Sequence, residues 1–287
     1  MKKNLLISGQ LALVAILLLL ASGAYARLTD PPWLMSTTPG TVPLASGQCK
    51  FGSETLEVEV YDQVRPGQLD PFKVTVAGNK ATTLKAGDLL EIIPEDRPVI
   101  LSCYGHPVQV KGAWYTVTVP AKGKTPVVKR FTGATGKVLI KHASWVATFV
   151  GKKYVLNLTG GMAPVTIPCD TYTVTAFAES VKSKNGESVL QCNFPSFNPG
   201  KVYEVHGPAV AISANKTVAL AIGSPVIAKL EIEYLERRQV CFAYSATSAA
   251  GGPVNVQLAS GQLPNPPKVT IVTADGRKVT SFTMEYG

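Results

Sequence analysis

Apolar and polar residues alternate with a period of two along much of the chain after residue 48. The alternation is clear in segments 56–61, 72–76 and 115–119, where valine, leucine and aromatic residues take turns with threonine and charged residues. A period of two places the apolar side chains on one face of an extended chain, so these segments are predicted to be half-buried β-strands.

The same pattern predicts many further strands. They are expected at residues 137–142, 154–158, 172–177, 202–205, 218–222, 228–234, 240–245, 254–258, 269–272 and 279–286. After residue 26 no stretch of a dozen residues has a helical period, and the longest candidate, 176–184, meets the hairpin signal Asn185-Gly186. Short strands between frequent turn signals predict an all-β fold, an antiparallel β-sandwich with two Ig-like or jelly-roll-like domains.

A weak internal repeat underlies the prediction of two domains. The segment that begins at Gly67 resembles the one that begins at Gly261, and Leu90-Glu91-Ile92 resembles Leu230-Glu231-Ile232. Matches of this length also arise by chance in chains rich in valine and threonine, so one large sheet stays open as the alternative. With duplication, we expect β-sandwich domains at 49–160 and 161–287.

The N-terminus has the features of a secretory signal peptide. Lys2 and Lys3 precede an apolar run at 11–21, which is followed by Ala24-Tyr25-Ala26. The run is shorter than the roughly twenty residues that span a bilayer, so we predict cleavage after Ala26 over an uncleaved anchor. The mature protein is then expected to be secreted, at the cell surface or outside the cell, without a transmembrane segment.

Residues 27–48 form a proline-rich segment that is predicted to be an extended N-terminal arm. Such a segment often acts as a linker or a frayed terminus. The other interpretation is β-strand addition to a neighbouring subunit, in which apolar side chains fill pockets. The candidate assembly residues are Trp33, Leu34, Val42 and Leu44.

Charge is distributed unevenly along the chain. Residues 97–169 contain ten lysines and arginines and no Asp or Glu, whereas the part before them is acidic. The candidate basic patch comprises Lys122, Lys124, Lys129, Arg130, Lys137, Lys141, Lys152 and Lys153. Such a patch attracts an anionic polymer or an acidic surface on another copy of the chain. Because only 16% of residues are charged while 46% are hydrophobic, assembly is the favoured interpretation.

Export would permit disulfides, and the chain has five cysteines. Cys169 with Cys192 is the first candidate pair and Cys49 with Cys103 the second; five reduced thiols are the alternative. Asn157 and Asn215 each begin an acceptor sequence for N-linked glycosylation, if the host glycosylates exported proteins.

Sequence motifs of catalysis and cofactor binding are absent. The chain lacks the common hydrolase, zinc-protease, dinucleotide and phosphate-loop motifs. Cys103 and His106 have ligand-like spacing, but the further ligands of a copper site are missing around them. We therefore predict no catalytic residue, no cofactor and no metal. Trp114 and Trp145 lie among basic residues, which favours an anionic glycan over nucleic acid in an exported protein.

Two functional hypotheses follow. The first is a secreted, non-enzymatic structural subunit that forms a homopolymeric filament, surface layer or matrix through β-strand addition and head-to-tail charge complementarity. The alternative is a monomeric secreted module that binds an anionic glycan or cell-wall polymer, with Trp114 or Trp145 as a stacking platform.

Overall fold

The computed structural model describes residues 41–76, 82–85, 87–183, 186–193, 202–204, 207–235, 239–258 and 262–285. All regular elements in these ranges are β-strands, arranged in several mostly antiparallel sheets, so the all-β prediction is confirmed. No helix in the described ranges is long and apolar enough to cross a membrane. The predicted signal peptide, 1–26, and the first part of the predicted arm lie outside the described residues.

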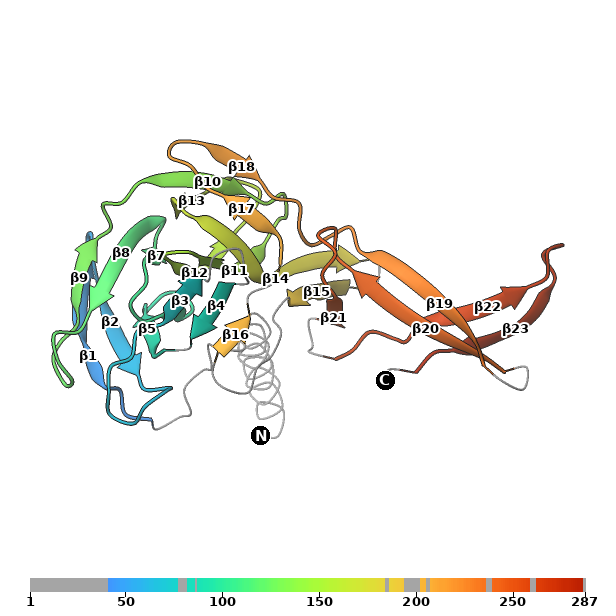
Figure 1. Cartoon of the computed structure of the whole chain (residues 1–287), viewed down its shortest axis with the longest axis horizontal. Helices are drawn as coiled ribbons and strands as arrows, with labels where there is room; N and C mark the ends of the chain where they lie inside the picture. Colours follow the sequence, from blue (N-terminus) through green and yellow to red (C-terminus); the bar gives the residue numbers. More distant parts are fainter. Residues whose placement is uncertain are drawn as a thin grey trace, which may run out of the picture.

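Two sheets form the N-terminal part of the body (Figure 1). One has the order β1 (Ala45–Phe51), β2 (Glu54–Tyr61), β5 (Leu89–Ile93) and β6 (Ile100–Cys103), and the other contains β7 (Val108–Val110), β8 (Ala113–Thr118) and β9 (Val127–Arg130). Val58 and Val60 are fully buried between them with Leu90, Ile92 and Val117, as the alternation in the sequence predicts.

A larger pair of sheets follows. The six-stranded sheet has the order β12 (Val155–Gly160), β11 (Trp145–Gly151), β14 (Thr171–Ser183), β15 (Gly186–Asn193) and β21 (Val254–Leu258), and β17 (Ala209–Ala211) also pairs with β14. The three-stranded sheet contains β13 (Val165–Pro168), β10 (Thr135–Leu139) and β18 (Thr217–Ala219). Large side chains such as Trp145, Phe149, Tyr172 and Phe177 fill the core of this part.

A third apolar cluster joins the two parts of the body. Tyr61 and Leu89 from the first part belong to one buried cluster with Val155 of β12 and with Leu84, which lies on the small sheet of β3 (Lys73–Val76), β4 (Thr82–Lys85) and β16 (Val202–Glu204). The expected domain boundary at residue 160 falls within the six-stranded sheet, because β11 pairs with β12 before the boundary and with β14 after it.

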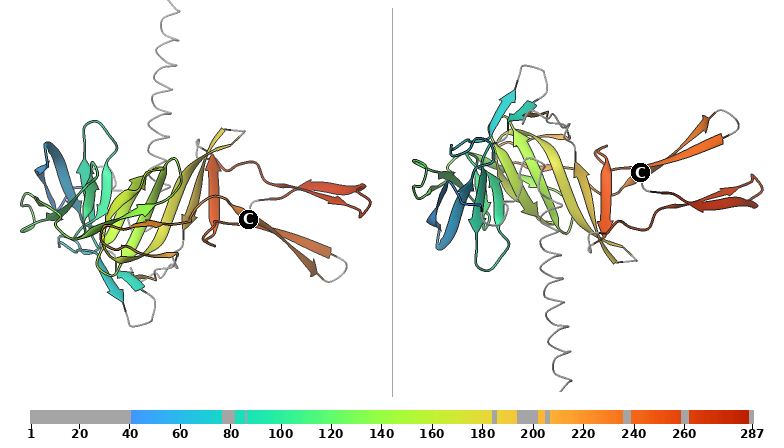
Figure 2. Two further views of the ribbon diagram at one scale, coloured as in Figure 1. Left: turned by 90° about the horizontal axis from the view of Figure 1, so that it is seen from above. Right: turned by 90° about the horizontal axis from the view of Figure 1, so that it is seen from below.

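Two hairpins project from the body at the end away from β1 (Figures 1 and 2). The first consists of β19 (Ile227–Leu235) and β20 (Gln239–Thr247), and the second of β22 (Lys268–Val272) and β23 (Lys278–Thr283). Among the residues whose side chains the structure describes, which leave out 233–240 of the first hairpin and residue 257, the last buried apolar side chain is Ile222. The described side chains of the hairpins therefore add no fully buried apolar group to the core.

The proposed disulfide between Cys49 and Cys103 is wrong, because both residues carry free, buried thiols. They lie on β1 and β6, the opposite edges of a four-stranded sheet. Three strand spacings amount to about 14 Å, and a disulfide requires Cα atoms within about 7 Å. The Cys49 thiol instead donates to the carbonyl of Pro126 at 3.1 Å.

The proposed disulfide between Cys169 and Cys192 is also wrong, because Cys169 carries a free thiol. Cys192 pairs with Phe177 in the β14–β15 register, whereas Cys169 precedes β14, which begins at Thr171. The chain from Thr171 to Phe177 extends roughly 20 Å along the strand. The two cysteines are therefore too far apart to be bridged.

This arrangement predicts the reactivity of the thiols. Burial raises the pKa of the Cys49 and Cys103 thiols, whereas Cys241 on β20 is exposed. Alkylation of the native protein followed by mass spectrometry should modify Cys241 readily and Cys103 only after denaturation. A non-reducing peptide map that contains a Cys49–Cys103 or Cys169–Cys192 linkage would contradict the described arrangement.

Candidate functional site

The first projecting hairpin has one apolar face. Its register pairs Leu230 with Tyr244 and Ile232 with Phe242, and paired residues lie on the same face of a ribbon. Ala228 and Ala246 form the next pair on that face. The intervening positions, which include Lys229, Glu231 and Ser245, form the opposite face and are mostly polar. The hairpin thus has the alternation of a strand pair that covers a core.

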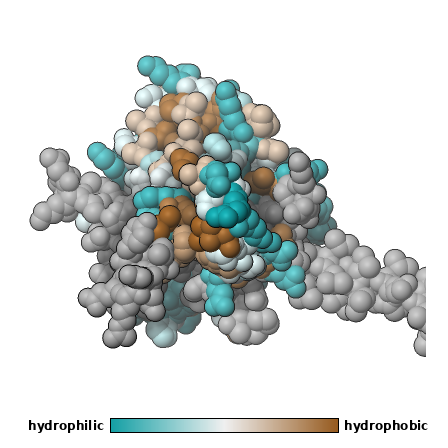
Figure 3. Space-filling model, turned by 90° about the vertical axis from the view of Figure 1, so that its right-hand side faces the viewer, coloured by the Kyte–Doolittle hydropathy of each residue, from teal (hydrophilic) through white to brown (hydrophobic). Residues whose placement is uncertain are grey.

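The apolar face is largely uncovered. Leu230 is 45% exposed, Ile232 51% and Tyr244 47%. Figure 3, which views this end of the molecule, shows hydrophobic surface beside hydrophilic surface. Of the large apolar side chains that are exposed in the described ranges, most belong to residues 227–279: Ile227, Leu230, Ile232, Tyr244, Leu263, Val272 and Val279. Of this set, Leu230, Ile232 and Tyr244 share one face of the first hairpin, and such a group marks an interaction surface more often than scattered single residues do.

The second hairpin directs its own apolar face toward the first. Val269 pairs with Phe282, and Ile271 lies on the same side of β22. The ring of Phe282 contacts that of Phe242, with centroids 5.4 Å apart. On the other face, the hydroxyl groups of Thr270 and Ser281 are 3.1 Å apart.

We call these two hairpins the hairpin fork, because Figure 2 shows them diverging toward their tips. Its apolar surface consists of Leu230, Ile232, Phe242, Tyr244, Val269, Ile271 and Phe282. Among the described strands, β19 pairs only with β20 and β22 only with β23. Each strand therefore presents an open edge of backbone N–H and C=O groups, to which another chain can add a strand.

The residues of the candidate basic patch are all exposed, but they come from four places in the fold. They lie in the loop before β9, on β9 itself, on and just after β10, and in the turn between β11 and β12. None of them forms a side-chain ion pair with another described residue. Arg130 instead lies over the ring of Tyr115. Their charges are thus available to an anionic partner.

Several acidic residues of the N-terminal part serve the fold itself. Glu54 accepts a hydrogen bond from Arg97 at 2.8 Å and pairs with Lys111, and these hydrogen bonds lower its pKa to about 2. In contrast, Glu95 and Asp96 are exposed in the turn between β5 and β6. Asp96 contacts Arg97 at 3.4 Å in an exposed ion pair, and both carboxylates stay open to solvent, so a neighbouring subunit can reach them.

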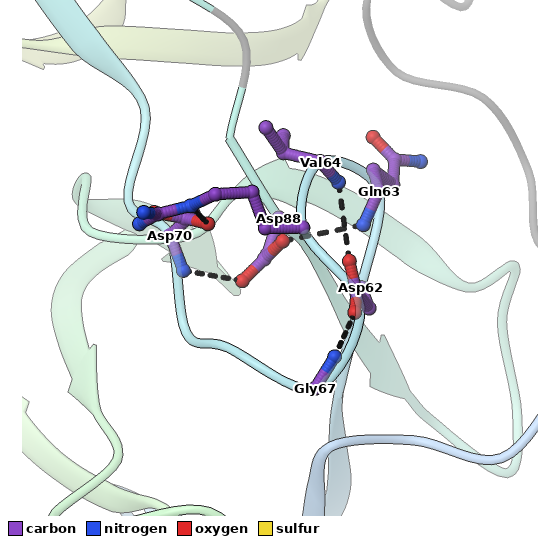
Figure 4. Close-up of polar contacts among 7 residues, drawn as sticks. Asp62, Gln63, Val64, Gly67, Asp70 and Asp88 are labelled. Carbon is purple, nitrogen blue, oxygen red and sulfur yellow. Dashed lines mark hydrogen bonds and ion pairs between the residues drawn. The ribbon is translucent and has the colours of Figure 1, made fainter.

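A buried aspartate closes the loop between β2 and β3 (Figure 4). Asp88, which is fully buried, accepts hydrogen bonds from the backbone N–H groups of Gln63 at 3.2 Å and Asp70 at 2.6 Å. Asp62 accepts one from the N–H of Gly67 at 2.5 Å, and Asp70 pairs with Arg65. The carboxylates thus hold the loop. No group of three metal-binding side chains occurs in the described ranges, including this loop.

The tryptophans do not offer a stacking platform. Trp114 is 5% exposed and Trp145 is 1% exposed. Their indole N–H groups donate to the carbonyls of Thr166 at 2.9 Å and Gly161 at 3.1 Å, respectively. The expectation that one of them stacks on a glycan is therefore wrong, because both rings belong to the core.

The two glycosylation candidates differ in accessibility. The Asn157 side-chain amide donates to the carbonyl of Leu101 at 3.3 Å and accepts from Thr148 at 2.8 Å, so it is held within the fold. Asn215 is exposed in the turn between β17 and β18, with a positive φ of 58° that a turn asparagine tolerates. Asn157 is thus half-buried and held by hydrogen bonds, whereas Asn215 is exposed.

Most of the predicted arm residues that the structure describes belong to the body. Leu44 is buried, its N–H donates to the carbonyl of Val60 at 2.7 Å, and residues 45–48 are part of β1. Val42 is 81% exposed. Trp33 and Leu34 lie outside the described residues. The arm that is available to a neighbour therefore ends before Leu44 and not at residue 48.

The histidines described by the structure have structural partners. His106 is buried, and its ring nitrogens bond the carbonyl of Phe72 at 3.1 Å and the N–H of Val155 at 3.2 Å. Burial lowers the pKa of His106, which favours the neutral ring. His142 contacts the Glu179 carboxylate at 2.5 Å and the carbonyl of Ile222 at 2.7 Å. Both rings link distant segments.

No protein-family model, curated protein or solved structure matches this chain. The identification of the hairpin fork as the candidate functional site therefore depends on its geometry alone. The pattern in the sequence located the strands 228–234 and 240–245 but placed them in a sandwich. The missed signal was the content of this face, which carries the four large apolar side chains Leu230, Ile232, Phe242 and Tyr244.

The environment of Asp88 predicts a pH-dependent contribution to stability. Burial raises its pKa to about 6, above the value near 4 of an unfolded chain. A carboxyl group whose pKa is higher in the folded than in the unfolded chain stabilises the fold fully below pH 4. This stabilisation is lost as the pH rises through 6. Asp88→Asn keeps the shape but replaces one acceptor oxygen with a donor that faces an N–H, which costs about 1–3 kcal/mol.

We therefore expect that urea denaturation shows a larger stability difference between wild type and Asp88→Asn at pH 4 than at pH 7. Carboxylates that the two proteins share, such as Glu54, cancel in this difference. Asp96→Asn at an exposed position is the matched control and should change stability little at either pH. A difference that is independent of pH would show that Asp88 does not titrate with a raised pKa.

Proposed function

We propose that this chain is an exported, non-enzymatic structural subunit that self-assembles head to tail into an extracellular filament, surface layer or matrix. The observation that carries the proposal is the uncovered apolar face of the β19–β20 hairpin. Export rests on the pattern of residues 1–26 in the sequence.

The energetics of the hairpin favour a covered state. A two-stranded hairpin is at best marginally stable in water when neither face is packed. Full burial of a leucine or isoleucine side chain stabilises by about 1.5–3 kcal/mol. Leu230, Ile232 and Tyr244 are each about half exposed, so a partner that covers them would recover several kcal/mol. A second copy of the chain is the partner that is always present.

The layout of the molecule supports a heterologous contact. The fork lies at one end of the molecule and β1 at the other (Figures 1 and 2). A contact that joins unlike ends of two copies propagates into a filament when its rotation does not close a ring. The exposed cations of the basic patch and exposed acids such as Glu95 and Asp96 would set register and speed encounter.

The proposal is tested by neighbouring substitutions on β20. Tyr244 lies on the apolar face and Ser245 on the polar face, and both side chains are exposed. Tyr244→Asp and Ser245→Asp therefore add the same charge to opposite faces of one strand. The assay is size-exclusion chromatography with light scattering on residues 27–287 at low and high salt.

Wild type and Ser245→Asp should form large species, and Tyr244→Asp should weaken their formation tenfold or more, since tenfold corresponds to about 1.4 kcal/mol. Salt should slow assembly by screening the charged contacts while the apolar contact persists. A wild-type protein that stays monomeric at every salt concentration would refute the proposal.

One observation favours a second function, the binding of an anionic glycan or cell-wall polymer. The basic-patch side chains are exposed and form no ion pair among the described residues. Because Trp114 and Trp145 are buried, such binding would be electrostatic and without aromatic stacking.

The second function predicts retention of the protein on an immobilised polysulfated glycan and elution by moderate salt. Lys129→Ser combined with Lys137→Ser should lower the eluting salt concentration. Lys229→Ser on the hairpin is the control and should leave it unchanged. Retention that survives high salt, or that ignores the patch substitutions, would argue against this function.

A further inference from the structure

We propose that the apolar surface of the hairpin fork receives the N-terminal segment of a second copy, with residues 33–38 as the inserted strand. This inference rests on the proposed function, because it identifies the two surfaces that meet when copies assemble.

The fork has the chemistry of an acceptor. Its two apolar faces approach each other at the rings of Phe242 and Phe282, whose centroids are 5.4 Å apart. Away from this contact the surface stays open, since Leu230, Ile232 and Tyr244 remain about half exposed. Apolar side chains on the faces and unpaired backbone groups on the strand edges match what an added strand requires.

The body of the same copy does not supply the cover. The hairpins project away from the body, and after Ile222 no apolar side chain is buried among those that the structure describes, which leave out residues 233–240 and 257. The longest stretch outside the described residues is 1–40, of which 27–40 remain after the expected cleavage. Residues 27–40 are therefore the segment of the mature chain that can cover the apolar surface of the fork.

Residues 33–38, Trp-Leu-Met-Ser-Thr-Thr, suit the surface. They form the proline-free run between Pro32 and Pro39 and carry no charge. As a strand they would span about 20 Å, which is comparable to the length of β22. Trp33 and Met35 would lie on one side and Leu34 on the other, so the segment has apolar groups for both inner faces of the fork.

The start of the described chain indicates that the donor is another copy. Leu44 is buried, its N–H donates to Val60, and its carbonyl accepts from the N–H of Gly123 at 2.8 Å. These contacts fix the base of the segment beside β1, at the end of the molecule away from the fork (Figures 1 and 2). A segment that leaves one copy at this end meets the fork of the next copy in a head-to-tail arrangement.

Photo-cross-linking in the full mature chain tests the inference. A benzophenone amino acid replaces Leu34, and light and heavy isotope-labelled subunits are mixed while dissociated and then allowed to assemble. The expected product joins position 34 of one label to residues 227–247 or 268–283 of the other. The same probe at the exposed body residue Val99 is the control and should not label the fork.

A double-mutant cycle supplies the energetic test. Trp33→Ala and Tyr244→Ala should each weaken assembly tenfold or more, and the double variant should weaken it by less than the product of the two factors, because the residues share one contact. Ser245→Ala, on the polar face, should combine with Trp33→Ala independently.

The outcomes separate this inference from the proposed function. If the chain assembles but position 34 cross-links to another surface of the neighbour, or only to its own copy, the inference is overturned. Self-assembly would then remain in place. A wild-type chain that remains monomeric would overturn both. If the double variant weakens assembly by the full product of the factors for Trp33→Ala and Tyr244→Ala, the two side chains do not contact each other.

Discussion

The need to cover the apolar face of each strand is the constraint on which this structure depends. In the body the constraint is met by facing sheets, which bury Val58 and Val60 in one core and Trp145 and Phe149 in the other. A third cluster around Leu84 and Val155 ties the two together. The same constraint is only partly met in the hairpin fork, where Phe242 and Phe282 contact each other but Leu230, Ile232 and Tyr244 stay about half exposed, and this difference is the basis of the functional proposal.

A comparison of two similar tripeptides illustrates the point. Leu90-Glu91-Ile92 lies on β5, where Leu90 and Ile92 are completely buried under the facing sheet. Leu230-Glu231-Ile232 lies on β19 and pairs with β20, but the second hairpin covers this face only in part, through the contact of Phe282 with Phe242, and both apolar side chains stay about half exposed. The local pattern is the same in both places, and only the covering layer differs.

Buried polar groups determine how the loops are held around the cores. Asp88 fixes the loop after β2 through two backbone N–H groups, and Glu179 accepts from the N–H of Ser224 at 2.5 Å while it contacts His142. Such groups are costly to bury without partners, so each is matched by specific hydrogen bonds. These hydrogen bonds give the polar side chains structural roles that account for their burial.

The sequence by itself determined the fold class and the positions of most strands, because a period of two is a local property of the backbone. It missed several others, among them the short strands β6 and β7 and also β11, where Trp145–Gly151 is buried on both faces and therefore lacks alternation. Only the tertiary structure decided which strands are covered, which thiols are separated by the sheet order, and which tryptophans are buried. These properties depend on the order and stacking of sheets, which arise from contacts between residues far apart in the chain.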